Sequence, residues 1–505
     1  MPEKYIKKIL QAQVYDVAIE SPLDEAASLS QRLQNRVLMK REDLQPVFSF
    51  KLRGAYNHIY QLSRRQTVEA VVAASAGNHA QGVALSASRL GIQATIVMPK
   101  TTPAIKVKAV QSWGAKTVLK GDNYDEACEY ASRLAQDKGA QFVHPYDDAD
   151  VIAGQGTIGM EILRQHAGDI EAVFVPVGGG GLIAGIGSYV KYLRPQTRII
   201  GVEPEDAPCM AEALKKNRRV ILDHVGIFAD GVAVKQVGRE TFRLAKKCVD
   251  EVITVSTDEI CAAIKDIFDD TRSITEPAGA LAVAGLKKYV EREALSGKTL
   301  IAINSGANMN FDRLRHVSER AELGEQREAL LAVTIPERPG SFRRFCKTIG
   351  KRGITEFNYR YADDTDAQVF AGIQLSEKPG EKQQLIDKLT AKGYPVLDMS
   401  DNEMAKIHVR HMVGGRNARL QNEALYRFEF PERPGALLDF LTSIGNRWNI
   451  SLFHYRNHGA AYGRVLVGLQ IAPAERKQLQ SYLDALAYPY WEETDNPAYR
   501  LFLAD

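Results

Sequence analysis

The chain has 505 residues, more than one hydrophobic core usually supports, and this length predicts about three globular units. Its 65 Lys and Arg almost balance its 62 Asp and Glu, and without a long basic run we expect no nucleic-acid partner. Five scattered cysteines predict neither disulfides nor a zinc site and favour the cytoplasm, and no apolar segment approaches the roughly 18 residues of a membrane span.

A lysine stands at the start of a predicted helix. Ser49-Phe50-Lys51 leads into residues 52–60, whose periodicity predicts a helix, so the amine of Lys51 projects from a fixed point. Schiff-base chemistry needs one placed amine that can lose its proton. A surface residue at a helix start is the alternative interpretation, and the residues alone leave it open.

Short β-branched runs alternate with longer amphipathic stretches between about residues 69 and 305. This alternation is typical of a wound α/β protein, with strands predicted at 71–74, 94–98, 173–177, 199–202 and 300–303. Several runs end in glycine, serine or asparagine where the next helical pattern begins. Open parallel sheets bind ligands beyond these carboxyl ends, so we expect the chemistry there.

The first such edge is Ala74-Ser75-Ala76-Gly77-Asn78-His79-Ala80-Gln81-Gly82. A predicted strand ends here, and a helix is expected to start at or near Asn78. The Ser75 hydroxyl and the neighbouring backbone amides can bind a carboxylate at such a turn. An ordinary helix cap is the alternative.

A second edge is the run Gly178-Gly179-Gly180-Gly181, between a predicted buried strand at 173–177 and a predicted helix at 182–190. The N–H groups of this loop and of the helix start would converge on one anion, and a phosphate monoester suits that arrangement. The spacing is not G-x-G-x-x-G, so a nicotinamide cofactor is not expected. A flexible turn is the alternative.

The pattern changes near residue 320. Residues 319–328 are a charged connector, and an internal repeat occupies the rest of the chain, because Ile335-Pro336-Glu337-Arg338-Pro339-Gly340 returns 95 residues later at 430–435. Residues 354–360 and 369–374 return 96 residues later. Each copy predicts strand, turn, helix, two strands, helix and strand, which is a ferredoxin-like α+β order.

Together these motifs resemble a known family. Ser49-Phe50-Lys51-Leu52-Arg53-Gly54-Ala55, the glycine run, 229–234, 275–280 and 303–308 resemble the fold-type II pyridoxal phosphate enzymes (tryptophan synthase β-like), and among them the threonine and serine dehydratases. The repeat resembles the ACT-like regulatory module, and two such modules in tandem match the biosynthetic threonine dehydratases. The resemblance implies a catalytic domain at 1–320, a connector at 321–328 and ACT-like subdomains at 329–400 and 422–505.

The resemblance also implies roles for individual residues. Lys51 would bind pyridoxal phosphate covalently and act in catalysis. The other cofactor-binding residues would be Asn78, at the phenolic oxygen, Ser305, at the pyridine nitrogen, and the phosphate-binding Gly178, Gly179, Gly180, Gly181 and Leu182. The substrate would be bound by Ser75, Ala76, Gly77, His79, Gly231 and Glu276.

Three residue types refine the expected reaction. The Ser305 hydroxyl cannot protonate the pyridine nitrogen as an acid can, which favours β-elimination. Related serine racemases carry a serine where this chain has Ala76, so racemisation is not expected. Cys209 stands where a cation-binding branch of the family has an acidic ligand, so we predict no metal.

The activity implied is conversion of L-threonine to 2-oxobutanoate and ammonia, the committing step of isoleucine synthesis, in a homotetramer that isoleucine inhibits and valine reactivates. The expected effector-binding residues are Phe357, Tyr359, Phe453 and Tyr455, for which core packing is the alternative. An L-serine dehydratase or another β-elimination or β-replacement enzyme would use the same chemistry. A catalytically silent amino-acid sensor is the alternative of another class, against which the intact Lys51 motif argues.

Overall fold

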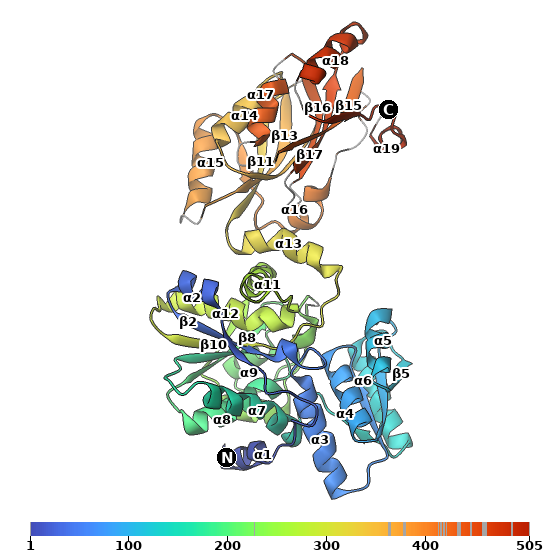
Figure 1. Ribbon diagram of the computed structural model, residues 1–505, viewed down its shortest axis with the longest axis vertical. Helices are drawn as coiled ribbons and strands as arrows, with labels where there is room; N and C mark the ends of the chain where they lie inside the picture. Colours follow the sequence, from blue (N-terminus) through green and yellow to red (C-terminus); the bar gives the residue numbers. More distant parts are fainter. Residues whose placement is uncertain are drawn as a thin grey trace. The chain divides into compact units, whose positions relative to one another are not determined.

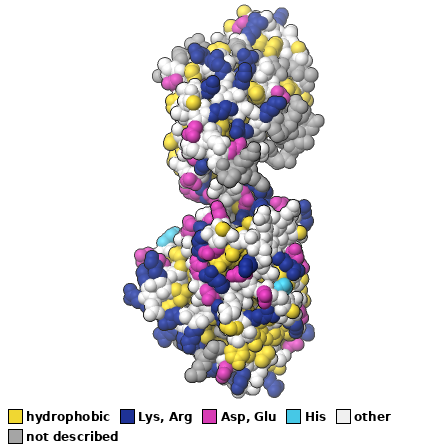
Figure 2. Space-filling model, turned by 90° about the vertical axis from the view of Figure 1, so that its left-hand side faces the viewer, with side chains coloured by type: hydrophobic (Ala, Val, Ile, Leu, Met, Phe, Trp, Pro, Cys, Tyr) yellow, Lys and Arg dark blue, Asp and Glu magenta, His cyan; other side chains and the backbone are white. Residues whose placement is uncertain are grey.

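The computed structural model describes residues 2–226, 228–361, 365–376, 380–412, 414, 417, 420, 422–431, 436–444, 447–456, 462–485 and 488–503. The chain divides into two compact units, Met1–Gly324 and Glu325–Asp505. No helix among these residues combines the length and the apolar character needed to cross a bilayer. On the face drawn in Figure 2, basic and acidic side chains are interspersed over both units.

The first unit contains two sheets. The larger has the strand order β1-β2-β10-β7-β8-β9, and only β1 runs antiparallel to its neighbour. Its strands are β1 (Leu23–Glu25), β2 (Arg36–Arg41), β7 (Ala172–Pro176), β8 (Arg198–Pro204), β9 (Glu251–Val255) and β10 (Thr299–Asn304). The smaller, parallel sheet has the order β5-β4-β3-β6 and consists of β3 (Ala70–Ala74), β4 (Gln93–Met98), β5 (Lys116–Leu119) and β6 (Gln141–Phe142). The predicted strands are confirmed, with bounds that differ by one or two residues.

Helices cover both faces of the larger sheet, with α7 and α8 on one side and α11 and α12 on the other (Figure 1). The helices of this unit are α1 (Pro2–Leu10), α2 (Ala27–Leu33), α3 (Lys51–Arg65), α4 (Asn78–Arg89), α5 (Ala104–Ser112), α6 (Tyr124–Asp137), α7 (Ala149–Gln165), α8 (Gly181–Leu193), α9 (Cys209–Lys215), α10 (Arg239–Cys248), α11 (Thr257–Thr271), α12 (Pro277–Glu293) and α13 (Arg313–Gly324), with 3-10 turns η1 (Glu42–Leu44) and η2 (Asp230–Val232). Val173 and Val175 of β7 join one core and Phe174 joins the other. Burial on both faces explains why this strand is a continuous apolar run.

The predicted connector is partly helical. Residues 321–324 belong to α13, in which Leu323 and Ala321 are buried. Arg320, the α13 residue just before the predicted connector, forms an ion pair with Asp258 on α11 at 2.5 Å. These apolar and ionic contacts hold the helix on the first unit, so only residues 325–327 separate α13 from β11.

The described residues of the second unit form one eight-stranded sheet, with the order β14-β11-β13-β12-β16-β17-β15-β18, together with several helices. Each repeat contributes four strands in a ferredoxin-like order, and antiparallel pairing of β12 with β16 joins the two repeats. Its strands are β11 (Glu328–Pro336), β12 (Ile354–Arg360), β13 (Asp366–Gln374), β14 (Val396–Asp398), β15 (Glu423–Pro431), β16 (Asn449–Arg456), β17 (Tyr462–Gln470) and β18 (Tyr490–Glu492). Its helices are α14 (Ser341–Ile349), α15 (Glu381–Ala391), α16 (Glu403–Ile407), α17 (Ala436–Ile444), α18 (Arg476–Ala485) and α19 (Pro497–Phe502), with 3-10 turns η3 (Val409–His411) and η4 (Pro473–Glu475). The predicted ferredoxin-like fold is confirmed, whereas residues 432–435 of the second turn lie outside the described residues.

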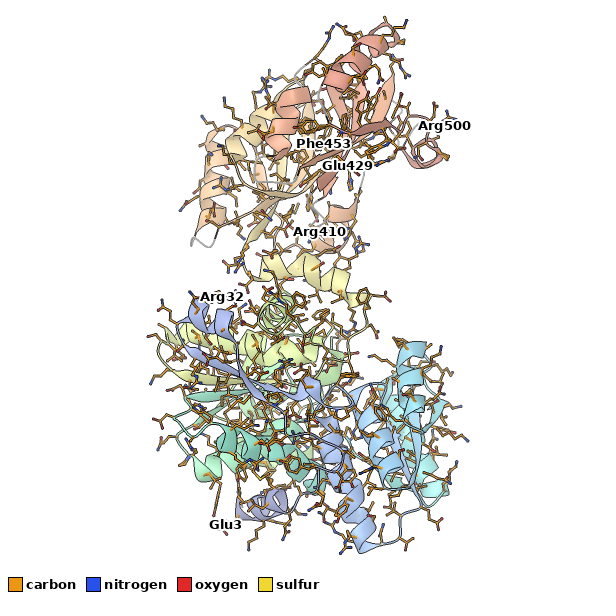
Figure 3. All side chains as sticks on the ribbon, viewed as in Figure 1. Glu3, Arg32, Arg410, Glu429, Phe453 and Arg500 are labelled. Atoms are coloured by element: carbon orange, nitrogen blue, oxygen red, sulfur yellow. The ribbon has the colours of Figure 1, made fainter. Side chains whose placement is uncertain are left out.

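The repeat extends to polar contacts that are partly buried. Glu328 and Glu423 begin equivalent strands, and they accept hydrogen bonds from the hydroxyls of Thr355 and Ser451, respectively, which are also equivalent. Arg410, labelled in Figure 3, lies 3.6 Å from Glu328. The two copies therefore share this carboxylate–hydroxyl hydrogen bond as well as their strand order.

Candidate active site

Lys51 is the first residue of α3 and lies beside the end of β10. Ser49 forms a β-bridge with Gly306, and the Phe50 N–H donates to the Ser305 carbonyl at 3.3 Å. Desolvation lowers the pKa of the Lys51 amine, while the negative charge of Glu276 opposes that shift. A lowered pKa makes the unprotonated amine, which is the nucleophile and the base, more available near neutral pH.

The glycine loop connects β7 to α8. Gly180 has a left-handed backbone with φ of 93°, and a Cβ there would stand 2.7 Å from the Met210 methyl carbon. A Cβ on Gly179 would stand 2.3 Å from the ring of Tyr146. The Thr241 hydroxyl donates to the Gly179 carbonyl at 2.7 Å. The loop is thus held from outside, while the first N–H groups of α8 have no partner within the helix and are free to bind an anion.

The turn between β3 and α4 is open toward a ligand. The Ser75 hydroxyl accepts from the Gly77 N–H at 3.2 Å. No heavy atom of the described residues outside the turn itself lies within 4 Å of where a Cβ on Gly77 would stand. The buried ring of His79 contacts the Val143 carbonyl at 3.0 Å, and burial lowers its pKa to about 3. His79 is therefore neutral at pH 7, and its ring is held by backbone.

A closed ring of hydrogen bonds joins Asn78, Glu276 and Asn308. The Asn78 amide donates to Glu276 at 2.6 Å, the Asn308 N–H donates to the other Glu276 oxygen at 3.1 Å, and the Asn308 amide donates to Asn78 at 2.7 Å. Burial, and then the charge of Asp230, raise the pKa of Glu276 to about 7. The ring fixes the Asn78 amide beside a carboxyl group that can change its charge near neutral pH.

Two family descriptions cover the chain. "Pyridoxal-phosphate dependent enzyme" matches residues 14–306, and "C-terminal regulatory domain of Threonine dehydratase" matches residues 319–409 and 414–503. The biosynthetic L-threonine dehydratase IlvA of Burkholderia multivorans is 56% identical over 503 residues, 99% of each chain. The protein of that name from Escherichia coli is 53% identical over 99% of this chain and 97% of its own.

The chain belongs to the biosynthetic threonine dehydratases.

Solved structures resemble this dehydratase as well. The processed form of threonine deaminase isoform 2 from Solanum lycopersicum aligns with a TM-score of 0.62 and 51% identity, over 63% of this chain and 93% of its own. A maize serine racemase aligns with a TM-score of 0.58 and 30% identity, over 62% of this chain and 96% of its own. The predicted fold-type II class is thereby confirmed.

The dehydratase uses pyridoxal phosphate, and its residues fit this cofactor. A Cβ at 179 or 180 would clash with Tyr146 or Met210, so the loop carries no side chain at these two positions, and its backbone N–H groups are the natural partners of a phosphate. Ser305 is buried, and within the described part of the chain its hydroxyl makes one long hydrogen bond, of 3.3 Å, to the Ala278 carbonyl. Lys51 would offer the aldehyde an amine of lowered pKa. The loop, the hydroxyl and the amine would hold the phosphate, the ring nitrogen and the aldehyde of this cofactor, respectively.

The structure brings the predicted site residues of this dehydratase together. A Cβ on Gly231 would stand 3.3 Å from the Glu276 carboxylate, and the next residue, Val232, lies against Gly178. These contacts link the Asn78–Glu276 pair to the glycine loop, whose next residue, Leu182, is buried at the start of α8. The roles assigned to the individual residues stay predictions.

Asn308, Tyr146 and Thr241 are site residues of the dehydratase that the sequence interpretation missed. Asn308 ends the quoted motif 303–308, so the motif carried a signal for it. Tyr146 and Thr241 reach the glycine loop from 33 and 62 residues away, and no local pattern marks them. Their contacts exist only in the folded chain.

The loop that contains Cys209 has its own hydrogen bonds. Glu203 accepts from the N–H groups of Met210 at 2.8 Å and Ala211 at 2.9 Å, and the Cys209 thiol lies 3.6 Å from the same carboxyl group. Burial raises the pKa of Glu203 to about 7. The start of α9 is thus held by the Glu203 carboxyl group, near the end of β8.

We predict a pH-dependent stability difference between the cofactor-free protein and its Glu276→Gln variant. The pKa of Glu276 is raised from 4.5 to about 7, so its contribution to stability is full below pH 4.5 and is lost as the pH rises through 7. Over that window the free energy of unfolding of the wild type should fall by about 3 kcal/mol relative to the variant. Urea unfolding of both proteins at a series of pH values measures this difference.

Glu203→Gln is the matched comparison, because burial raises the pKa of Glu203 to about 7 as well. The wild type should lose a similar amount of unfolding free energy relative to Glu203→Gln as the pH rises. In the double variant both losses should be absent. Parallel curves for the wild type and Glu276→Gln between pH 4.5 and 8 would contradict the prediction.

Proposed function

We propose that the chain converts L-threonine to 2-oxobutanoate and ammonia in the cytoplasm, with residues 1–320 as the catalytic domain, 321–328 as the connector, and 329–400 and 422–505 as regulatory subdomains. The observation that carries the proposal is Lys51 at the start of α3, held through Phe50 to Ser305 and acted on by the charge of Glu276 in the Asn78–Glu276–Asn308 ring. Relatives that are 56% and 53% identical over 99% of the chain bear the name of biosynthetic threonine dehydratase.

Substrate binding begins at the turn before α4. The Ser75 hydroxyl and the first N–H groups of α4, including that of His79, hold the threonine carboxylate, and the open space beside Gly77 lets the substrate approach the backbone. Ala76 places only a methyl group beside this site. This binding orients the Cα–H bond of the substrate toward Lys51.

Proton transfer is the task of Lys51. Pyridoxal phosphate, when bound, supplies the electron sink for the negative charge that develops at the substrate Cα. The Lys51 amine takes the Cα proton and is then placed to protonate the leaving β-hydroxyl. The Gly178–Gly181 loop anchors the phosphate, and the Ser305 hydroxyl at the pyridine nitrogen keeps the sink weak, which favours elimination.

The deciding experiment measures release of 2-oxo acid from threonine and from serine, each with and without isoleucine, by purified protein that carries pyridoxal phosphate. We expect threonine to be preferred by about 10- to 200-fold, since the two substrates differ by one methyl group. Serine preference would favour the serine dehydratase alternative. Turnover of neither substrate would overturn the elimination mechanism and favour the amino-acid sensor.

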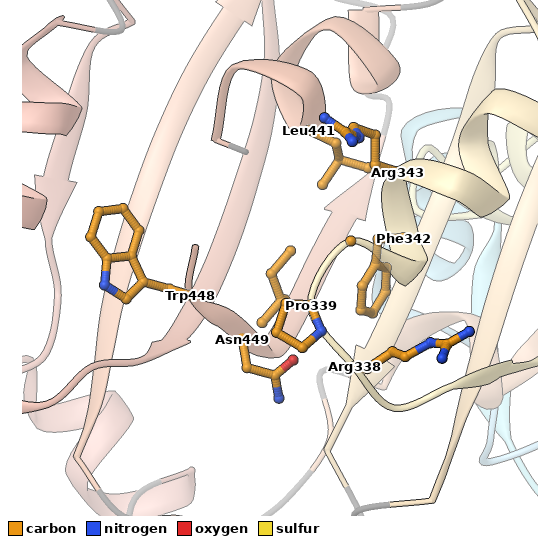
Figure 4. A pocket seen from close by; sticks show the side chains of 9 residues that line it. Arg338, Pro339, Phe342, Arg343, Leu441, Trp448 and Asn449 are labelled. Carbon is orange, nitrogen blue, oxygen red and sulfur yellow. The ribbon is translucent and has the colours of Figure 1, made fainter. Parts of the chain in front are cut away.

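The second unit is proposed to bind isoleucine as an inhibitor and valine as its antagonist, in a homotetramer. A pocket between the two repeats supports this proposal (Figure 4). It is lined by Arg338, Pro339, Gly340, Phe342 and Arg343 of the first repeat and by Leu441, Trp448, Asn449 and Ile450 of the second. Apolar side chains beside two arginines suit the side chain and the carboxylate of a branched amino acid.

The predicted effector residues lie behind this pocket. Phe357, Tyr359 and Phe453 pack against Phe342, which lines the pocket, with ring centroids 4.8–6.2 Å apart. Tyr455, paired with Phe357 across the β12–β16 junction, is buried in the same core. Their direct contact with an effector stays a prediction.

We predict that Leu441→Trp weakens inhibition by isoleucine by about tenfold or more, because the larger ring would fill the pocket and such a loss corresponds to about 1.4 kcal/mol. Thr442→Trp introduces the same ring at the next residue of α17, on an exposed position, and should leave inhibition unchanged. Isoleucine titrations of threonine turnover compare the two. Equal inhibition of both variants would place the effector elsewhere.

A further inference from the structure

The arginine of the lysine motif has no role in the proton transfers described above. Arg53 stands two residues after Lys51 in the first turn of α3 and is completely buried. Its Nε and Nη2 donate to the two oxygens of Glu42 at 2.8 and 2.9 Å, and its Nη1 donates to Glu161 at 2.6 Å. This planar, two-sided pairing is specific to a guanidinium group.

A second cation completes the cluster. The Lys40 amine, also completely buried, lies 2.6 Å from Glu161. Arg53 and Lys40 thus balance the charges of Glu42 and Glu161 in the interior. A cluster of equal numbers of buried, hydrogen-bonded charges is tolerated in low dielectric, but loss of one partner leaves an uncompensated charge.

The charged partners of Arg53 come from two other elements, and its Nη2 also donates to the Ile19 carbonyl at 3.1 Å. Glu42 belongs to η1, directly after β2, and Glu161 belongs to α7. The same turn of α3 is packed closely, since a Cβ on Gly154 of α7 would stand 2.5 Å from the Arg53 carbonyl and one on Gly82 of α4 would stand 3.1 Å from the Leu52 Cα. Packing leaves the turn little freedom to shift, and the guanidinium fixes its direction.

We propose that Arg53 is a positioning residue that sets the place of the Lys51 amine by locking the first turn of α3 to η1 and α7. The inference rests on the proposed function, in which Lys51 binds the cofactor and moves the substrate proton. A lysine at position 53 would keep one positive charge but could not pair with both carboxylates. A displacement of about 1 Å in a reacting group costs about 100-fold in rate.

The test compares Arg53→Lys with Lys40→Met, because each variant changes one buried cation that pairs with Glu161. Four quantities are measured on both variants and the wild type: the urea midpoint, amide hydrogen exchange of residues 46–56 without cofactor, pyridoxal phosphate trapped on Lys51 by borohydride, and kcat and KM for threonine. For Arg53→Lys we expect faster exchange in that segment, less trapping and a kcat lowered by about 100-fold with KM changed less than about threefold. For Lys40→Met we expect a lower urea midpoint with exchange, trapping and kcat near those of the wild type.

The inference is overturned if Arg53→Lys keeps wild-type exchange, trapping and kcat, or if Lys40→Met loses trapping and kcat to the same extent. If Arg53→Lys does not fold, Thr157→Val removes one acceptor of the guanidinium, 3.1 Å from Nη1, with little change of shape. It should lower kcat by about three- to tenfold, and an unchanged kcat would overturn the inference. A wild-type protein that traps no cofactor on Lys51 overturns the proposed function instead.

Discussion

Replacing Lys51 by alanine is expected to lower kcat for threonine by about 10⁴-fold or more. The variant lacks both the covalent anchor for the cofactor and the group that moves the substrate proton. In the wild type, desolvation lowers the pKa of the Lys51 amine, and the charge of Glu276 opposes that shift. Release of 2-oxo acid and the absorbance of the bound cofactor measure the two losses separately.

Lys51→Arg is the matched variant. It keeps a positive charge at the start of α3, but a guanidinium remains protonated and cannot act as a base at neutral pH. It should therefore be as inactive as Lys51→Ala while binding the cofactor phosphate. Added methylamine should restore part of the activity of Lys51→Ala, since a small amine can enter the vacated space. Turnover within about tenfold of the wild type in either variant would exclude Lys51 as the base.

Replacing Gly180 by alanine is expected to weaken binding of pyridoxal phosphate by about 10- to 100-fold. The backbone of Gly180 is left-handed, and a Cβ would stand 2.7 Å from the Met210 methyl carbon and 3.0 Å from the Thr241 Cβ. The Met210 methyl group ends a flexible side chain and can move away, but alanine is strained at this left-handed φ and stands close to Thr241, which also holds the Gly179 carbonyl. Relief of that strain is expected to shift the loop that carries the anion-binding N–H groups. Titration of the cofactor-free protein with pyridoxal phosphate gives the dissociation constant.

Gly297→Ala separates backbone strain from the loss of the loop. Gly297 is also left-handed, with φ of 68°, but no heavy atom of the described residues beyond its chain neighbours lies within 4 Å of the new Cβ. This control should lose about 1 kcal/mol of stability and keep its affinity for the cofactor. Equal affinities in both variants would show that the loop tolerates a side chain.

The local parts of this fold are the parts that the sequence predicts. Strands such as β7, buried on both faces, are apolar runs that end at turn residues, so their positions and the ligand edge beyond them can be inferred from pattern alone. The start of α4 at Asn78 and the glycine loop before α8 are inferred in the same way. Chemistry at the ends of strands is therefore predictable from one chain.

Contacts between distant segments could not be predicted in this way. Arg53 and Glu161 are 108 residues apart and Asn78 and Asn308 are 230 apart, and no periodicity relates them. The charged stretch before the second unit has no β-branched run, yet apolar residues such as Leu323 hold it as a helix. In these cases tertiary packing, which pattern does not encode, decides the outcome.

Pairing of β12 with β16 determines how the second unit can associate with other chains. This pairing places one long edge strand of each repeat, β12 and β16, inside the sheet. The outer strands are therefore β14 and β18, of three residues each. Such short edges offer little unpaired backbone to another strand. Copies of this protein that meet through the second unit must therefore do so by side-chain contacts between helices or sheet faces, and growth into a continuous intermolecular sheet is disfavoured.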